Sequence, residues 1–143
     1  MIHLPDVNVL LALAWSNHPH HEAAHRWFVS ESVEGWATCL LTQGGFLRLS
    51  LNPQVVGVRL DASVTLDLLM DLVAHPRHQY VQTSPPLTDD AFADLARRIA
   101  GYRQVTDSTL LHVVRANSMK LVSFDRAVAT ICPWSENLEV LPC

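Results

Sequence analysis

The sequence predicts an α/β protein, a three-layer α/β/α sandwich in which helices cover both faces of a mostly parallel central sheet. Short apolar runs that are typical of buried strands alternate along the chain with longer segments of helical periodicity. Hydrophobic residues make up 49% of the 143 residues, which is enough for a core between two layers of helices. No linker, repeat or low-complexity tract interrupts this alternation. We therefore expect residues 1–143 to form a single domain.

The first half of the chain contains two expected strands and four expected helices. In order, these are the strand 1–4, the helices 7–14 and 18–28, the strand 35–39, and the helices 40–53 and 61–76. Asn8 is a suitable N-cap for the first helix, and Pro19 lies near the first turn of the second. Asn52 and Pro53 should end the third helix.

The second half repeats the alternation. We expect the strand 78–83, the helices 88–101 and 105–117, the strand 120–125, one or two helical turns over 126–132 and a last strand 138–141. Thr88 is the expected start of the helix that Gly101 ends. Parallel strands need crossover helices, so this order predicts a sheet with both faces covered.

Charge and cysteine content limit the functional class. Fourteen acidic residues against ten basic ones give a net charge of −4, which excludes a generally basic nucleic-acid binder. Any polyanion that the protein binds must therefore contact a local basic patch or bound metal ions. The cysteines Cys39, Cys132 and Cys143 lack zinc-site spacing and favour packing roles in a reducing compartment. No apolar run is long enough to span a bilayer, so we expect a cytoplasmic protein without membrane contact.

Three aspartates fall on the edge of the sheet where ligands bind in such folds. Asp6 follows the first strand, Asp107 opens a helix, and Asp125 ends the strand 120–125. Each alone is explained as an N-cap. Together they would repel one another and raise each other's pKa unless a cation neutralised them. Oxygen ligands without paired cysteines favour Mg²⁺ or Mn²⁺.

Four blocks of the sequence, "LPDVNVLLALAW", "TCLLTQGGFLRLSLNP", "YRQVTDSTLLHVV" and "KLVSFDRAV", resemble successive blocks of the PIN domain. Their order, spacing and total length are similar to the VapC toxins of bacterial toxin–antitoxin pairs. The resemblance implies a PIN-like fold and a Mg²⁺-dependent endoribonuclease that is a homodimer held inactive by a cognate VapB-like antitoxin. Asp6, Asp107 and Asp125 match the family's acidic metal-binding positions, and Asn8 and Ser123 match its polar helpers.

One position departs from the family pattern. Many relatives carry glutamate where "LLTQGGF" has Gln43, although a VapC-like branch that this chain resembles also has glutamine. We expect Gln43 to orient a metal-bound water or the substrate, so Gln43→Glu should tighten metal binding. By analogy with the family, hydrolysis would leave a 5′-phosphate and a 3′-hydroxyl. The arginines that flank the acidic blocks are candidates for holding RNA phosphates: Arg48, Arg103, Arg115 and Arg126.

Two other functions remain open at this point. His21-Glu22-Ala23-Ala24-His25 spells H-E-x-x-H, the signature of zinc metallohydrolases, on an expected helix. The extended form fails, because Phe28 and Glu31 stand where its glycine and third histidine would be. The second alternative is a catalytically degenerate module that binds RNA or a partner without cutting, which Gln43 alone supports.

Overall fold

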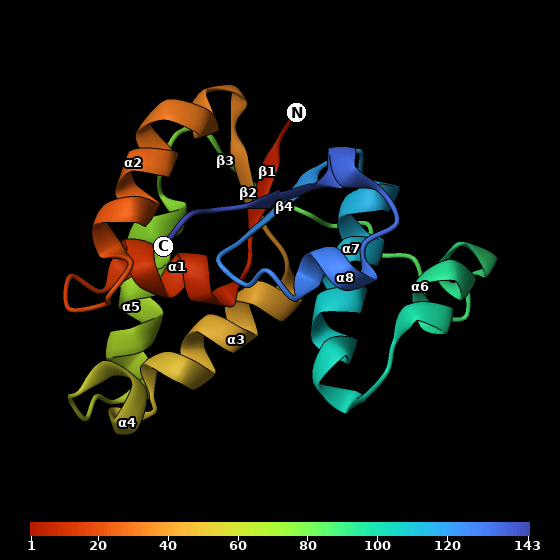
Figure 1. The fold of residues 1–143 in the computed structure, drawn as a ribbon. Coiled ribbons are helices and arrows are strands. Elements are labelled where there is room, and N and C mark those ends of the chain that lie inside the picture. Colours follow the sequence, from red (N-terminus) through yellow and green to blue (C-terminus); the bar gives the residue numbers. More distant parts are fainter.

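The computed structural model describes residues 1–143 and has one five-stranded, all-parallel sheet of order β3-β2-β1-β4-β5 (Figure 1). Its strands are β1 (His3–Pro5), β2 (Trp36–Thr38), β3 (His78–Tyr80), β4 (Lys120–Ser123) and β5 (Leu138–Val140). All five lie in segments where the sequence predicts a strand, and the α/β/α class is confirmed. The sheet reverses its winding direction at β1, so the carboxyl ends of β1 and β4 meet at the centre of one edge.

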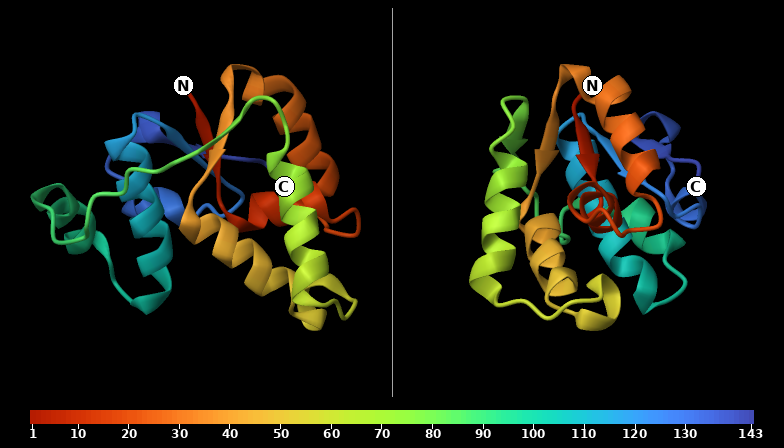
Figure 2. Two further views of the ribbon diagram at one scale, coloured as in Figure 1. Left: turned by 180° about the vertical axis from the view of Figure 1, so that it is seen from behind. Right: turned by 90° about the vertical axis from the view of Figure 1, so that its left-hand side faces the viewer.

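Helices cover both faces, as the parallel strands require. One face carries α1 (Val7–Ala14), α2 (His21–Glu31), α3 (Leu40–Ser50) and α5 (Ala62–Val73), and the other carries α6 (Ala93–Arg98), α7 (Val105–Ala116) and α8 (Val128–Ile131). The two groups stand on opposite sides of the sheet in Figure 1. Viewed from behind, the segment that follows α5 runs across the molecule toward α6 (Figure 2).

Alternation along the strands divides the core into clusters. Leu4, Ala37 and Leu121 face α7 in a cluster of 14 buried residues. Trp36 and Val122 belong to two smaller clusters of 5 and 8 buried residues, which pack against α1, α2, α3 and α5. Neighbouring residues of a strand point to opposite faces of the sheet. The cluster to which a strand residue belongs therefore also shows on which face the residues at the end of that strand lie.

Short helical segments complete the chain. They are α4 (Pro53–Val56), which the sequence did not predict, and the 3₁₀ turns η1 (Ser32–Glu34), η2 (Asp90–Phe92), η3 (Tyr102–Gln104) and η4 (Ser135–Asn137). Asn52 does end α3, but its side chain also accepts from the backbone N–H of Gln54 and caps α4. Gly57, at φ 80°, then closes α4 in the left-handed conformation.

Two expected helices begin later than the sequence predicts. The helix expected from Thr88 to Gly101 starts at η2, where Asp89 rather than Thr88 caps the turn by accepting from the backbone N–H of Ala91 at 2.9 Å, and α6 ends at Arg98. The helix expected from residue 18 begins at His21. None of the helices is long and apolar enough to cross a membrane.

Candidate active site at the carboxyl edge of the sheet

Asp6 lies between β1 and α1 and caps the helix. Its backbone is extended, and its Oδ1 accepts from the backbone N–H of Val9 at 3.0 Å. The expected cap, Asn8, is instead an exposed residue of the first turn. Asp6 is only 7% exposed, so its carboxyl group is largely removed from water.

Burial makes Asp6 a weaker acid than an ordinary aspartate. Desolvation is the largest cause that raises its pKa to about 6, and the charge of Asp107 adds to it. Hydrogen bonds from the Ser123 hydroxyl and from the Val9 backbone act in the opposite direction. No lysine, arginine or histidine forms an ion pair with Asp6, Asp107 or Asp125. The negative charge at this edge is therefore not balanced by the protein.

Asp107 and Asp125 extend this acidic group from two other elements. Asp107 lies half-buried in the first turn of α7, and its pKa is raised by burial first and by the charge of Asp125 second. Asp125 follows β4, is exposed, and accepts from the backbone N–H of Ala127 at 2.9 Å. The charge of Asp107 thus acts on Asp6, and the charge of Asp125 acts on Asp107. No three acidic, histidine or cysteine side chains are grouped closely enough to hold one metal ion as they stand.

Ser123 joins two members of this group. It is fully buried at the end of β4, and its Oγ accepts from the backbone N–H of Asp125 at 3.0 Å while the hydroxyl serves Asp6. Because β1 and β4 are neighbours in register, the serine holds the two strand ends and their acids together. The sequence analysis placed Ser123 beside the last acid, and the structure adds its contact with Asp6.

The structure does not bring Gln43 to the acids. Its Nε2 donates to Thr38 Oγ1 at 2.9 Å, and Thr38 Oγ1 lies 2.8 Å from His78 Nε2 on the outer strand β3. Thr38 shares its face with Trp36, on the side of the sheet away from α7. Gly45 of α3 packs against Val7. Gln43 lies two residues earlier on the same helix, so its side chain points about 160° away from that contact around the helix axis. The role expected for Gln43 at a metal-bound water stays a prediction, and its hydrogen bond to Thr38 favours a competing one, that position 43 takes no part in metal binding.

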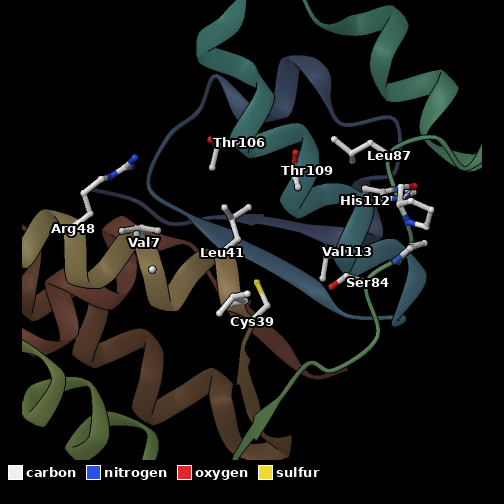
Figure 3. A pocket seen from close by; sticks show the side chains of 15 residues that line it. Val7, Cys39, Leu41, Arg48, Ser84, Leu87, Thr106, Thr109, His112 and Val113 are labelled. Carbon is white, nitrogen blue, oxygen red and sulfur yellow. Dashed lines mark hydrogen bonds between the residues drawn. The ribbon is translucent and has the colours of Figure 1, made fainter.

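A cleft of about 630 Å³ opens between α3 and α7 beside the acidic group. Figure 3 shows Thr106 and Thr109 of α7 facing Leu41 and Arg48 of α3 across it. Val7, which also lines the cleft, follows Asp6, and Thr106 precedes Asp107. None of the three acids lines the cleft itself, but the immediate neighbours of two of them do. Gly44 and Gly45 of α3 also line the cleft, which the sequence does not predict.

The candidate arginines differ in their freedom to bind phosphate. Arg115 donates to Glu136 and Asn137 at 3.0 and 2.9 Å and lies over the Trp134 ring, so its role is structural. Arg48 lines the cleft and is exposed. Arg126 is exposed directly after Asp125. Arg103 of η3 is exposed and contacts the Tyr102 side chain.

The H-E-x-x-H motif has a structural role. His21 Nδ1 lies 2.7 Å from the carbonyl oxygen of Ala12, and His25 Nε2 lies 3.1 Å from that of Leu13. Both imidazoles therefore bind carbonyl groups that the last turn of α1 leaves without helical partners. Glu22 is exposed beside Arg26, and no third ligand joins the histidines. Nothing in this arrangement favours the zinc metallohydrolase.

Comparison with known proteins agrees with the geometry. The family model of the PIN domain matches residues 4–132. Ribonuclease VapC38 of Mycobacterium tuberculosis is 41% identical over 128 residues, which cover 90% of this chain and 88% of that one. Ribonuclease VapC39 of the same species is 36% identical over 129 residues, covering 90% and 92% of the two chains.

A solved structure shares the fold. The crystal structure of M. tuberculosis VapC20, described as a sarcin–ricin loop cleaving toxin, superimposes with a TM-score of 0.65 at 18% identity and covers 98% of this chain and 99% of that one. At that identity the likeness bears on the fold alone. The family match and the two curated relatives span nearly the whole chain, and the protein therefore belongs to the PIN domain family and, within it, to the VapC ribonucleases.

Proposed function

We propose that the protein is a Mg²⁺-dependent endoribonuclease, the toxin of a toxin–antitoxin pair, that hydrolyses RNA phosphodiester bonds. The observation that carries this proposal is the acidic group without counter-charges beside an open cleft. Its Asp6 is almost fully buried, and no cation of the protein compensates it. Its curated relatives are named ribonucleases.

The residues of the site fit a divalent cation. Asp6 and Asp107 would hold it and Asp125 would complete its coordination, which needs a modest approach of the side chains because the three are not yet grouped around one point. Carboxylate oxygens are the ligands that Mg²⁺ prefers, and Mn²⁺ accepts the same set. The raised pKa of Asp6, about 6, also fits, because a bound cation would offset the cost of its burial.

The metal ion would supply a water of lowered pKa and stabilise charge on the phosphoryl oxygens. The chain's own residues orient the reaction. Ser123 holds Asp6 and the Asp125 backbone in a fixed relation. Asn8, two residues after Asp6, presents an exposed amide that can donate to a phosphate oxygen. Arg48 and Arg126 supply positive charge on either side for the RNA backbone.

Regulation and assembly belong to the same proposal. A VapB-like antitoxin would hold the toxin inactive in the cytoplasm, and two copies of the chain would form a homodimer. The apolar surface around the cleft supports protein contacts there, because Leu40, Leu41, Leu87 and Val105 are all exposed. Leu40 is 74% exposed, which is unusual for leucine on a helix that also packs in the core.

Cleavage of RNA by the purified chain tests the proposal. Wild type should cut RNA with Mg²⁺, stop with EDTA and recover when Mg²⁺ is restored. Asp107→Ala should abolish cleavage and relieve growth arrest on expression, whereas Asp67→Ala, on the exposed face of α5, should change neither. Mg²⁺-dependent cleavage that survives Asp6→Ala or Asp107→Ala would exclude these acids as the metal site. Light scattering of the purified chain measures whether it is a dimer.

A further inference from the structure

Tyr102 is the most exposed large hydrophobic residue of the molecule. Its side chain is 80% exposed, and it belongs to none of the three core clusters. An aromatic ring in this position adds nothing to the packing of the domain. A ring that packs against nothing in the chain is available to stack on a ligand.

The position of Tyr102 relates it to the acidic group. Tyr102 and Arg103 belong to η3, which runs directly into α7. They precede Thr106 and Asp107 by four residues, so each pair lies about one turn apart on a shared face of the helix. Thr106 lines the cleft and Asp107 belongs to the acidic group. Tyr102 is not itself a lining residue, but it lies four residues before Thr106, at the end of α7 that carries the acid.

The chemistry of the pair points to a nucleic-acid strand. Arg103 Nε donates to the Tyr102 hydroxyl at 3.3 Å, and its guanidinium carbon lies 5.7 Å from the ring centroid. Arg103 lies over one side of the ring, and the 80% exposure of Tyr102 leaves ring area free for a flat partner. Single-stranded nucleic acids bind to such combinations, because the bases stack on the ring and the cation meets the phosphates.

We propose that Tyr102 is the base-stacking residue of the RNA cleft: a nucleobase beside the scissile phosphate stacks on its ring, and Arg103 contacts a neighbouring phosphate. This inference rests on the proposed ribonuclease function and adds to it a residue that contacts the substrate base. Stacking of this kind is tolerant of sequence, so Tyr102 contributes affinity for unpaired RNA rather than recognition of one base.

The test compares Tyr102→Ala and Tyr102→Phe with Tyr80→Ala, a control at the end of the outer strand β3, where the tyrosine is 42% exposed. Binding of a short fluorescein-labelled single-stranded RNA is measured by anisotropy with EDTA, and cleavage kinetics are measured with Mg²⁺. Tyr102→Ala should raise Kd and KM by about tenfold with kcat retained, because one base stack is lost. Tyr102→Phe and Tyr80→Ala should match wild type.

A second measurement locates the contact. When single bases of the RNA are replaced by abasic sites in turn, one replacement should weaken binding to wild type but leave binding to Tyr102→Ala unchanged. Three results would overturn the inference: unaltered RNA affinity in Tyr102→Ala, equal losses in the Phe and Ala variants, or a changed molecular mass of Tyr102→Ala in light scattering, which would mark an interface residue. If wild type binds RNA without cutting it, the proposed function fails while the stacking contact stands; if it neither binds nor cuts RNA, both fail.

Discussion

Replacing Asp6 by Asn tests the burial of an uncompensated charge at the site. Asparagine keeps the shape of the side chain and an oxygen that can cap α1 at the Val9 N–H. Raising the pKa of Asp6 from 3.8 to about 6 means that the folded protein binds its proton more tightly than the unfolded chain does. The wild type therefore loses stability as the pH rises from about 4 to 6, and the loss is complete above that window.

The size of the effect follows from the same pKa. The rise corresponds to about 3 kcal/mol, so Asp6→Asn should raise the free energy of unfolding by about that amount at pH 7.5 in EDTA. The gain should shrink toward zero as the pH approaches 4. Urea titrations across this range measure it. Added Mg²⁺ should stabilise the wild type alone and narrow the difference, because ligand binding to the folded state adds to its stability.

Asp89→Asn is the matched control, since Asp89 is an exposed N-cap that bonds the Ala91 N–H in the same way. It should change stability by less than about 0.5 kcal/mol at any pH. An Asp6→Asn protein that is no more stable than wild type at pH 7.5 would refute the argument, because it would mean that the carboxylate is compensated or hydrated. In either case the variant should have lost RNA cleavage.

Three further changes follow from contacts described above. Gln43→Glu should leave the Mg²⁺ affinity unchanged in calorimetric titration, because position 43 faces Thr38 and not the acids; a tenfold tighter site would contradict this placement. Gly45→Ala should destabilise the protein by about 1–3 kcal/mol in urea, since a Cβ there would lie 2.5 Å from Val7 Cγ2, whereas Gly44→Ala, with nothing within 4 Å, should not. His25→Ala should cost about 1 kcal/mol in thermal unfolding through the lost contact with the Leu13 carbonyl, and RNA cleavage should persist; loss of a bound zinc ion in elemental analysis would revive the metallohydrolase.

The sheet was predictable because its strands are short apolar runs between helical segments, and parallel order follows from that alternation. The acids were predictable for the same reason, since residues such as Asp6 and Asp125 directly follow a strand and the strand ends share an edge. The different environments of their carboxyl groups were not predictable, because they depend on burial. Asp6 is buried and Asp125 is exposed, although both follow similar apolar runs.

The direction of the Gln43 side chain could not be predicted from the local sequence. A neighbouring residue on a helix points 100° away, so the face that a side chain occupies depends on where the helix begins and on what it packs against. Here Thr42 fixes the start by bonding the Cys39 backbone, and Gly45 packs on Val7, which together turn Gln43 toward Thr38.

The pairing of β1 with β4 has a consequence for the folding of the chain. Asp6 follows β1 and Asp125 follows β4, far apart in the sequence, yet both depend on that one strand pair and on Ser123 for their relative placement. Such a contact between distant parts of the chain forms late in folding, after the long intervening loop has been closed. The acidic group of the candidate site therefore takes its final arrangement only when β4 has docked beside β1.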